Sequence, residues 1–305
     1  MKKLTVKVFG LLLGVILLVL EINSLWEMYM WNSSTYRKMP DKITIANTGS
    51  SHGVFGIDYK DYEENAFNFA MISQSLEYDY ELIDYYSDQF SEDSILLIVV
   101  SWYALWYDEL EEESFESKNT RYFAVLDKEH MRFNENENSY RNKNVPFINV
   151  INREVGNVFK EGINAGSVAE EKTLRKIGEE RAAAHLKLII SETGEVLPVL
   201  ENNREAIIKL VELCKRHNII PVIVTTPYLS EYSDNYPKEV KNVFNRTISE
   251  ICVNYEIEHW DFSEDERFCN SVNLFSDTDH LNGEGAKLFT GLIMENIQRE
   301  YSVNI

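Results

Sequence analysis

Five short runs of apolar residues punctuate the chain after about position 40, and two of them are continuous rather than alternating. A continuous apolar run is typical of a strand that is covered on both faces, as in a parallel sheet. We therefore predict five strands in one parallel sheet. The five runs are Lys42–Thr48, Ala66–Ala70, Ile95–Ser101, Ile219–Thr225 and Ile257–Phe262.

Apolar residues at helical spacing lie between these runs. Ile207, Leu210, Val211 and Cys214 repeat at i, i+3, i+4 and i+7 just before the fourth run. Alternation of strands and helices predicts an open α/β sheet flanked by helices, with ligand chemistry at the carboxyl ends of the strands. Two later helices are predicted from the sets Val240, Val243, Phe244, Ile248, Ile251 and Ala286, Phe289, Ile293, Ile297.

The N-terminus carries an apolar run, Val8–Leu20, behind Lys2, Lys3 and Lys7. A membrane-spanning helix needs about 20 residues, and snorkelling of Lys7 would extend the span to Leu4–Ile22. A cleaved signal peptide and a buried core helix are the alternatives. Since no A-x-A-like cleavage site follows the run, we favour an uncleaved anchor.

Lysines ahead of an apolar run are retained in the cytoplasm. We therefore expect a single-pass protein of the cell membrane, with its N-terminus inside and its catalytic domain outside. Residues 1–35 would hold the cytoplasmic lysines, the anchor and a juxtamembrane segment, and residues 36–305 the folded domain. Within that domain, about 108–200 is charged and has no clear strand, although Glu170–Leu188 suits a helix. We interpret this stretch as an insertion, either a lid or docking surface or a solvated excursion without a role.

Charge and cysteine content narrow the classes of function. The 305 residues include 30 Lys and Arg against 50 Asp and Glu, a formal charge of −20, which argues against nucleic acid as a partner. Cys214, Cys252 and Cys269 are three in number and lack C-x-x-C spacing, which argues against a zinc knuckle or a dense disulfide framework.

The first candidate for chemistry is Asn47–Gly53, which follows the first predicted strand and contains Ser50, Ser51 and His52. A serine on a tight strand-to-helix turn is exposed at the edge of a sheet, where a base can activate it. The same composition also suits an ordinary turn.

The second candidate is Asp277–Gly285, just before the last predicted helix. His280 would be a general base whose tautomer is set by an aspartate. The alternative is a helix cap, with Asp279 or Asn282 capping the last helix and His280 as a bystander.

A strand-end serine and a late Asp-x-x-His together resemble the SGNH/GDSL hydrolase family. The resemblance implies a flavodoxin-like sheet with Ser51 as nucleophile, His280 as base and Asp277, three positions earlier, as the orienting carboxylate. Asp279 does not fit that spacing, and its expected role is to cap the last helix. Thr225-Thr226-Pro227 and Trp260-Asp261-Phe262-Ser263 also look like the family.

The resemblance also implies an oxyanion hole. Backbone N–H groups of Ser51 and Ser73 are the expected donors. The asparagine that the family carries after the third strand is absent, and Ser101 or Tyr103 would stand in for it near the substrate. His52 would either touch substrate or fill the turn.

The anchor and Gly49-Ser50-Ser51 look closest to membrane-anchored relatives, namely the D-alanyl-transfer protein of teichoic acid operons and the polysaccharide O-acetylation proteins. This resemblance implies an O-acyltransferase or esterase that acts on cell-surface polysaccharide, with its acyl donor delivered by a membrane acyltransferase. A non-catalytic assembly or glycan-binding component is the alternative. A metal site at His52, Asp277, Asp279 and His280 matches no open-site spacing, so we expect neither a metal nor a cofactor.

Overall fold

The structure is a computed structural model that describes residues 2–62, 65–108, 115–133, 139–147 and 173–301. The chain forms two compact units. One combines residues 1–39 with 110–169, and the other combines residues 40–109 with 170–305.

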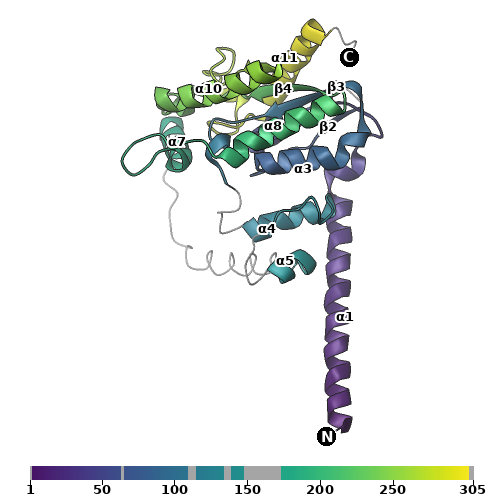
Figure 1. The fold of residues 1–305 in the computed structure, drawn as a ribbon. Coiled ribbons are helices and arrows are strands. Elements are labelled where there is room, and N and C mark those ends of the chain that lie inside the picture. The colour runs from purple at the N-terminus through teal and green to yellow at the C-terminus, as the bar shows by residue number, and fades with distance from the viewer. Residues whose placement is uncertain (1, 63–64, 109–114, 134–138, 148–172, 302–305) are drawn as a thin grey trace. The chain divides into compact units, whose positions relative to one another are not determined.

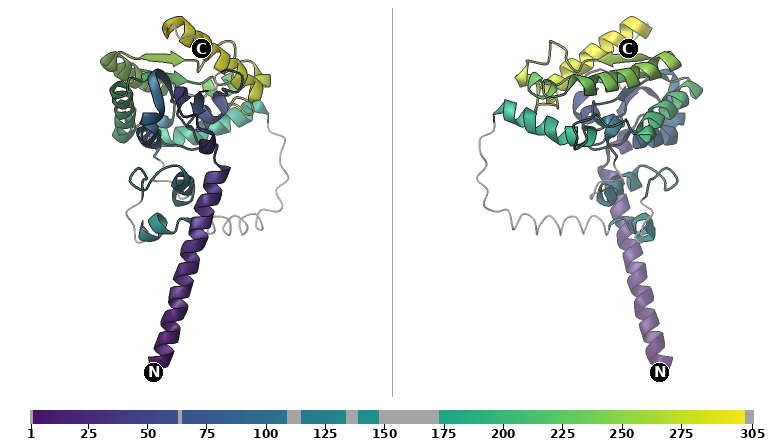
Figure 2. Two further views of the ribbon diagram at one scale, coloured as in Figure 1. Left: turned by 90° about the vertical axis from the view of Figure 1, so that its right-hand side faces the viewer. Right: turned by 60° about the vertical axis from the view of Figure 1, so that its left-hand side comes forward.

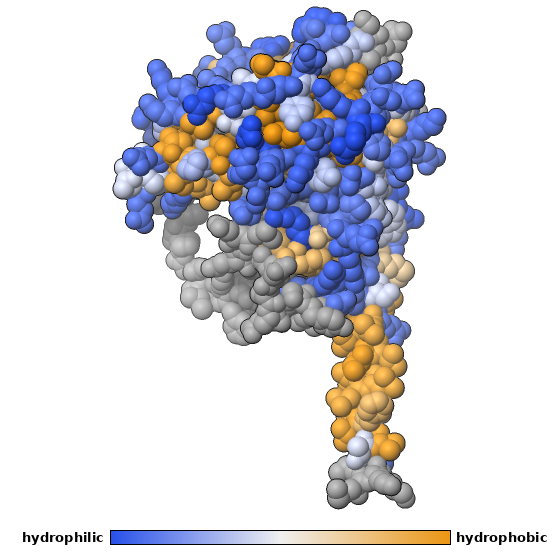
Figure 3. Space-filling model, viewed as in Figure 1, coloured by the Kyte–Doolittle hydropathy of each residue, from blue (hydrophilic) through white to orange (hydrophobic). Residues whose placement is uncertain are grey.

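Among the described residues of the first unit, the long helix is α1 (Lys2–Ser33). Its stretch Thr5–Ser33 has a mean hydropathy of 2.4, and it is long and apolar enough to cross a membrane by length and composition. Figure 3 shows that the surface of α1 is hydrophobic over much of its length. The other elements that the structure describes in this unit are short: η1 (Thr35–Lys38), α4 (Phe115–Asn119), η5 (Thr120–Ala124) and α5 (Ser139–Asn144).

The second unit is built on a five-stranded sheet in the order β2-β1-β3-β4-β5, in which every neighbouring pair is parallel. This is the strand order of a flavodoxin-like sheet, so the predicted fold class is confirmed. The strands are β1 (Ile43–Asn47), β2 (Ala66–Asn68), β3 (Phe90–Val99), β4 (Ile220–Thr225) and β5 (Glu258–Asp261).

Strand β3 begins five residues earlier than the apolar pattern predicts. The register shifts where Ile43 pairs with Phe90 but Ile45 pairs with Ile95. Asp93 in the extra segment has a φ of 57°, so the backbone leaves the regular pleat there. Because the irregular part is polar and half-exposed, periodicity alone does not reveal it.

Helices cover both faces of the sheet (Figures 1 and 2). On one side α3 and α8 pack against one another. On the other, α11 places Phe289, Ile293 and Ile297 in a core cluster with residues of β1, β3 and β4. The helices of this unit are α2 (Ser51–Gly56), α3 (Leu76–Tyr86), α7 (Leu174–Ile189), α8 (Glu201–Arg216), α9 (Ser230–Ser233), α10 (Lys238–Tyr255) and α11 (Gly283–Tyr301), with 3₁₀ turns η2 (Ser87–Gln89), η3 (Ala104–Trp106) and η6 (Val272–Leu274).

Part of the expected insertion lies outside the described residues, namely 109–114, 134–138 and 148–172. Its last part is α7, which Thr173 caps by accepting a hydrogen bond from the Lys176 N–H. Helix α7 packs against α9, beyond the carboxyl end of β4. The insertion therefore contributes a helix to the unit that holds the sheet.

Candidate active site

A tight turn between β1 and α2 presents Ser51. Gly49 has a φ of 121°, which favours glycine, and a Cβ at this position would lie 2.9 Å from the backbone oxygen of Val99. The Gly49 N–H donates a hydrogen bond of 2.9 Å to Asp79 Oδ1. Ser51 follows as the first residue of α2, at the carboxyl edge of the sheet.

The second candidate segment is a turn closed by its own first residue. Asp277 Oδ1 accepts hydrogen bonds from the backbone N–H of Asp279 at 3.0 Å and of His280 at 2.8 Å. The other oxygen of this carboxylate, Oδ2, lies 2.9 Å from His280 Nδ1. One turn therefore supplies a carboxylate and an imidazole already in contact.

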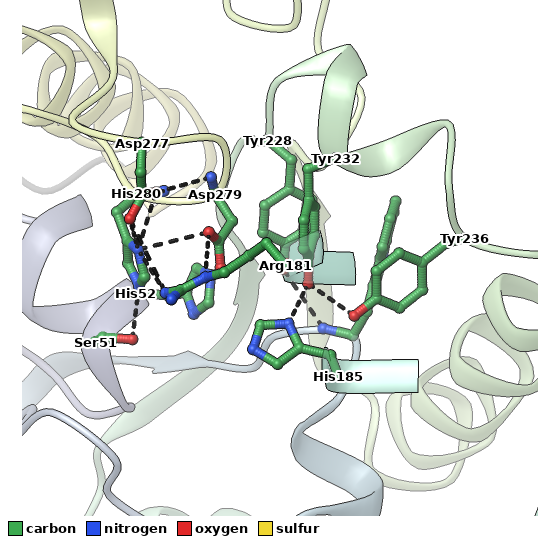
Figure 4. A network of polar contacts seen from close by, with 11 residues as sticks. Ser51, His52, Arg181, His185, Tyr228, Tyr232, Tyr236, Asp277, Asp279 and His280 are labelled. Atoms are coloured by element: carbon green, nitrogen blue, oxygen red, sulfur yellow. Dashed lines mark hydrogen bonds and ion pairs between the residues drawn. The ribbon is translucent and has the colours of Figure 1, made fainter. Parts of the chain in front are cut away.

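The two segments meet at the imidazole. His280 Nε2 lies 2.8 Å from Ser51 Oγ, and Figure 4 shows Ser51, His280 and Asp277 in a chain. Ser51 is 9% exposed and His280 7% exposed. In such a chain the imidazole can take the hydroxyl proton while the carboxylate holds the other ring nitrogen. The proximity expected from the resemblance is confirmed.

Asp277 remains ionised despite being half-buried. Burial favours the neutral acid, but the hydrogen bond to His280 and the backbone N–H of Asp279 stabilise the carboxylate and hold the pKa of Asp277 below its ordinary value. An ionised Asp277 can accept a hydrogen bond from Nδ1–H of His280, which the triad arrangement requires.

Arg181 of α7 reaches the same turn. Its Nε donates a hydrogen bond of 2.9 Å to Asp279 Oδ1, and its Nη2 lies 3.2 Å from His280 Nδ1. Nη2 is also 4.0 Å from Asp277 Oδ2. The insertion helix thus places a cation beside both aspartates.

Asp279 does not cap the last helix, and that expectation is wrong. Asn282 caps α11, because its Oδ1 accepts hydrogen bonds from the N–H groups of Glu284 and Gly285. The turn closed by Asp277 points the Asp279 side chain inward, where it is fully buried against Arg181. Burial would favour the neutral acid, but His52, His280 and Arg181 lower the pKa of Asp279 below its ordinary value.

The expected oxyanion residues lie on the turns beyond β2 and β3. Ser73 has a φ of 57°, the left-handed conformation that favours glycine. The Met71 N–H donates to the Gly49 oxygen at 3.2 Å, which ties this turn to the one that carries Ser51.

Ser101 and Tyr103 follow β3. Ser101 is buried, and its Oγ has no hydrogen-bond partner among the described residues. Burial raises the pKa of Tyr103, although the hydroxyl of Ser50 beside it acts in the opposite direction. Tyr103 therefore stays a neutral donor next to the turn that carries Ser51.

His52 is enclosed beneath His280. It is 2% exposed, and the two imidazole rings stack with centroids 4.8 Å apart. Burial lowers the pKa of His52, so the ring is neutral near pH 7. Its Nε2 lies 3.6 Å from Asp279 Oδ2, beyond hydrogen-bond distance, and His52 fills the turn in this structure.

No motif in the sequence points to Arg181 or His185 as a site residue. His185 Nδ1 lies 2.7 Å from the Tyr232 hydroxyl (Figure 4). The His185 ring also stacks on Tyr103, with ring centroids 4.0 Å apart. The available signal was helical spacing, since Gly178, Arg181 and His185 fall on one face of α7.

A metal ion would find few free donors in this turn. Donor atoms of His52, Asp279 and His280 lie within 4.8 Å of one another. Both nitrogens of His280 face Ser51 and Asp277, however, and Asp279 Oδ1 accepts from Arg181. His52 Nε2 and Asp279 Oδ2 remain, which is fewer than the three protein ligands of a catalytic zinc site.

No protein-family model and no curated protein matches the chain. Solved structures do. A candidate acylhydrolase from Bacteroides fragilis is 12% identical with a TM-score of 0.38, over 85% of this chain and 87% of that one. A GDSL-like lipase from Bacteroides thetaiotaomicron is 10% identical with a TM-score of 0.38, over 91% and 97%. Protein YxiM from Bacillus subtilis is 11% identical with a TM-score of 0.41, over 87% and 58%. These likenesses are remote, and they assign no function to this chain.

Proposed function

We propose that this protein is a serine-dependent acyl-ester enzyme. The observation that carries the proposal is the row of side-chain contacts from Ser51 through His280 to Asp277. The distance between Ser51 Oγ and His280 Nε2 is 2.8 Å, and that between His280 Nδ1 and Asp277 Oδ2 is 2.9 Å. In this chain the imidazole faces the hydroxyl with one nitrogen and a carboxylate with the other, as nucleophilic catalysis by serine requires.

The reaction would run in two halves. Ser51 Oγ attacks the acyl carbonyl carbon while His280 Nε2 takes the hydroxyl proton, and the new C–O bond gives a tetrahedral oxyanion. As the bond to the leaving oxygen breaks, His280 returns the proton to that oxygen and Ser51 is acylated. Water or a sugar hydroxyl then attacks the acyl-serine, its proton passing to His280 and from there to Ser51.

Backbone N–H groups of Ser51 and Ser73 are the proposed donors to the oxyanion, with Tyr103 or Ser101 in place of the missing asparagine. The loss of one such donor typically lowers the rate by about 10²–10³. A neutral Tyr103 beside Ser50 and Ser101 supports this substitution.

We further propose that the enzyme transfers acyl groups, as an O-acetyltransferase or related enzyme, to cell-surface polysaccharide. A membrane acyltransferase would supply the acyl group. The hydrophobic helix α1 supports attachment to a membrane, and the lysines ahead of it favour a cytoplasmic N-terminus with the sheet-bearing unit outside. A reporter that is active only in the cytoplasm, fused after the last residue, is expected to be silent; an active reporter would contradict this location.

An activated ester tests the chemistry without knowledge of the natural substrate. Wild type should cleave a p-nitrophenyl ester, and Ser51→Ala should lose several powers of ten in kcat/KM. Ser271→Ala is the matched control, because the Ser271 hydroxyl donates to the Arg267 oxygen and lies outside the site. Mass spectrometry should find the acyl group on the peptide that carries Ser51. Equal activity in wild type and Ser51→Ala, with no acylated peptide, would favour a non-catalytic glycan-binding component.

A further inference from the structure

Three charged side chains crowd one atom, Nδ1 of His280. Asp277 Oδ2 lies 2.9 Å from it, Arg181 Nη2 lies 3.2 Å from it, and Asp279 Oδ1 lies 3.6 Å from it. Only Asp277 has a part in the triad. Arg181 and Asp279 lie beside the same nitrogen without belonging to the triad.

Arg181 and Asp277 favour opposite tautomers of His280. To accept the proton of Ser51, Nε2 must be bare, and Nδ1 must carry a proton that it donates to Asp277. A guanidinium has donors and no acceptor, so a hydrogen bond from Arg181 to Nδ1 would need a bare Nδ1. The proton would then sit on Nε2, and His280 could not act as base.

Asp279 is placed to restrain Arg181. Its side chain is fully buried while that of Arg181 is 40% exposed, and its Oδ1 accepts the Nε–H at 2.9 Å. Asp279 thereby restrains the guanidinium through Nε, the nitrogen next to the aliphatic part of the Arg181 side chain. Arg181 in turn occupies the carboxylate oxygen that would otherwise compete with Asp277 for the Nδ1 proton.

We infer that the Arg181–Asp279 ion pair positions the catalytic histidine, by keeping His280 in the tautomer that can take a proton from Ser51. The inference rests on the proposed function and deepens it. Neither residue touches the reacting atoms, so both are positioning residues.

Helix α7 sets where Arg181 stands. A Cβ on Gly178 would lie 2.1 Å from the backbone oxygen of Glu231, so α7 approaches α9 as closely as a backbone allows. His185, one turn beyond Arg181, contacts the Tyr232 hydroxyl at 2.7 Å. Contacts with α9 on both sides of Arg181 therefore fix this part of α7, as a positioning role requires.

Apolar replacement of one or both partners tests the inference. Asp279→Leu removes the restraint and leaves Arg181 beside Nδ1, so kcat/KM should fall by about 100-fold or more, as expected for a wrong tautomer. Arg181→Met/Asp279→Leu removes both groups and should recover at least about ten-fold over Asp279→Leu, because removing both partners of an ion pair leaves no unpaired charge in the site. A double variant no more active than Asp279→Leu would overturn the inference.

NMR spectroscopy is a second measurement, which reports the tautomer of His280 directly. In full-length protein labelled with ¹⁵N-histidine, the ring nitrogens of His280 should show the proton on Nδ1 in wild type and in the double variant, and on Nε2 in Asp279→Leu. The same tautomer in all three would overturn the inference. Arg175→Ala, an exposed arginine of α7 paired with Glu179, is the control for a general effect on the helix. If Ser51→Ala kept full activity the proposed function would fail, whereas the NMR reading would still test the tautomer.

Discussion

His280 Nε2 lies 2.8 Å from Ser51 Oγ although 229 positions separate the two residues. The contact forms because both residues stand on turns at the same edge of a parallel sheet. Ser51 begins the helix after β1, and His280 ends the turn before α11. The proposed nucleophile and its proposed base thus come from the two ends of the α/β unit.

Asp277→Asn should abolish most activity while preserving the fold. An asparagine oxygen can still accept the backbone N–H bonds that close the turn, but the amide cannot stabilise an imidazolium or fix its tautomer. We expect kcat/KM on an activated ester to fall by about 10⁴-fold. An unchanged circular dichroism spectrum and unfolding midpoint would attribute the loss to chemistry, and near-wild-type activity would remove Asp277 from the triad.

Gly178→Ala should lower both stability and activity. Its new methyl group would lie 2.1 Å from the Glu231 backbone oxygen, so α7 must move away from α9 and take Arg181 with it. Urea unfolding and ester hydrolysis are the measurements. Ala183→Val, on the exposed face of the same helix, should change both much less. Equal effects of the two substitutions would contradict a role for this helix contact.

Asn282→Ala should destabilise the protein by about 1–2 kcal/mol through the loss of a helix cap. Its Oδ1 accepts two N–H groups of α11, while its amide donates to the oxygens of Asn273 and Phe275. Asn282→Asp keeps the acceptor and should lose less. Urea unfolding distinguishes the two variants, and equal destabilisation would show that the amide donors matter more than the cap.

Stability should fall as the pH drops below about 6.5, in part because of His185. Burial lowers the pKa of His185 to about 4, below the ordinary value of 6.5. Between these values the unfolded chain binds a proton that the folded chain excludes, so acid favours unfolding. Glutamine in His185→Gln keeps a partner for Tyr232 but cannot titrate. The free energy of unfolding of this variant should therefore depend less steeply on pH over this window, and the difference in slope should correspond to at most about one bound proton. Parallel curves for the two proteins in urea unfolding against pH would contradict this assignment.

Much of the fold followed from the sequence. Continuous apolar runs predicted β4 within one residue at its start, and helical spacing located α8, α10 and α11. The Asp-x-x-His spacing predicted the contact between Asp277 and His280, because a four-residue turn closed by its own carboxylate is a local structure. The meeting of Ser51 with His280 followed from a resemblance rather than from either motif alone.

Only the tertiary structure decided what surrounds that contact. Asp279 could as well cap a helix as turn inward, and its neighbours in the chain do not distinguish the two. Its partner Arg181 lies 98 positions away on a helix of the insertion. Local spacing determines which side chains share a turn or a helix face, whereas the packing of α7 against α9 determines which charge reaches a buried carboxylate.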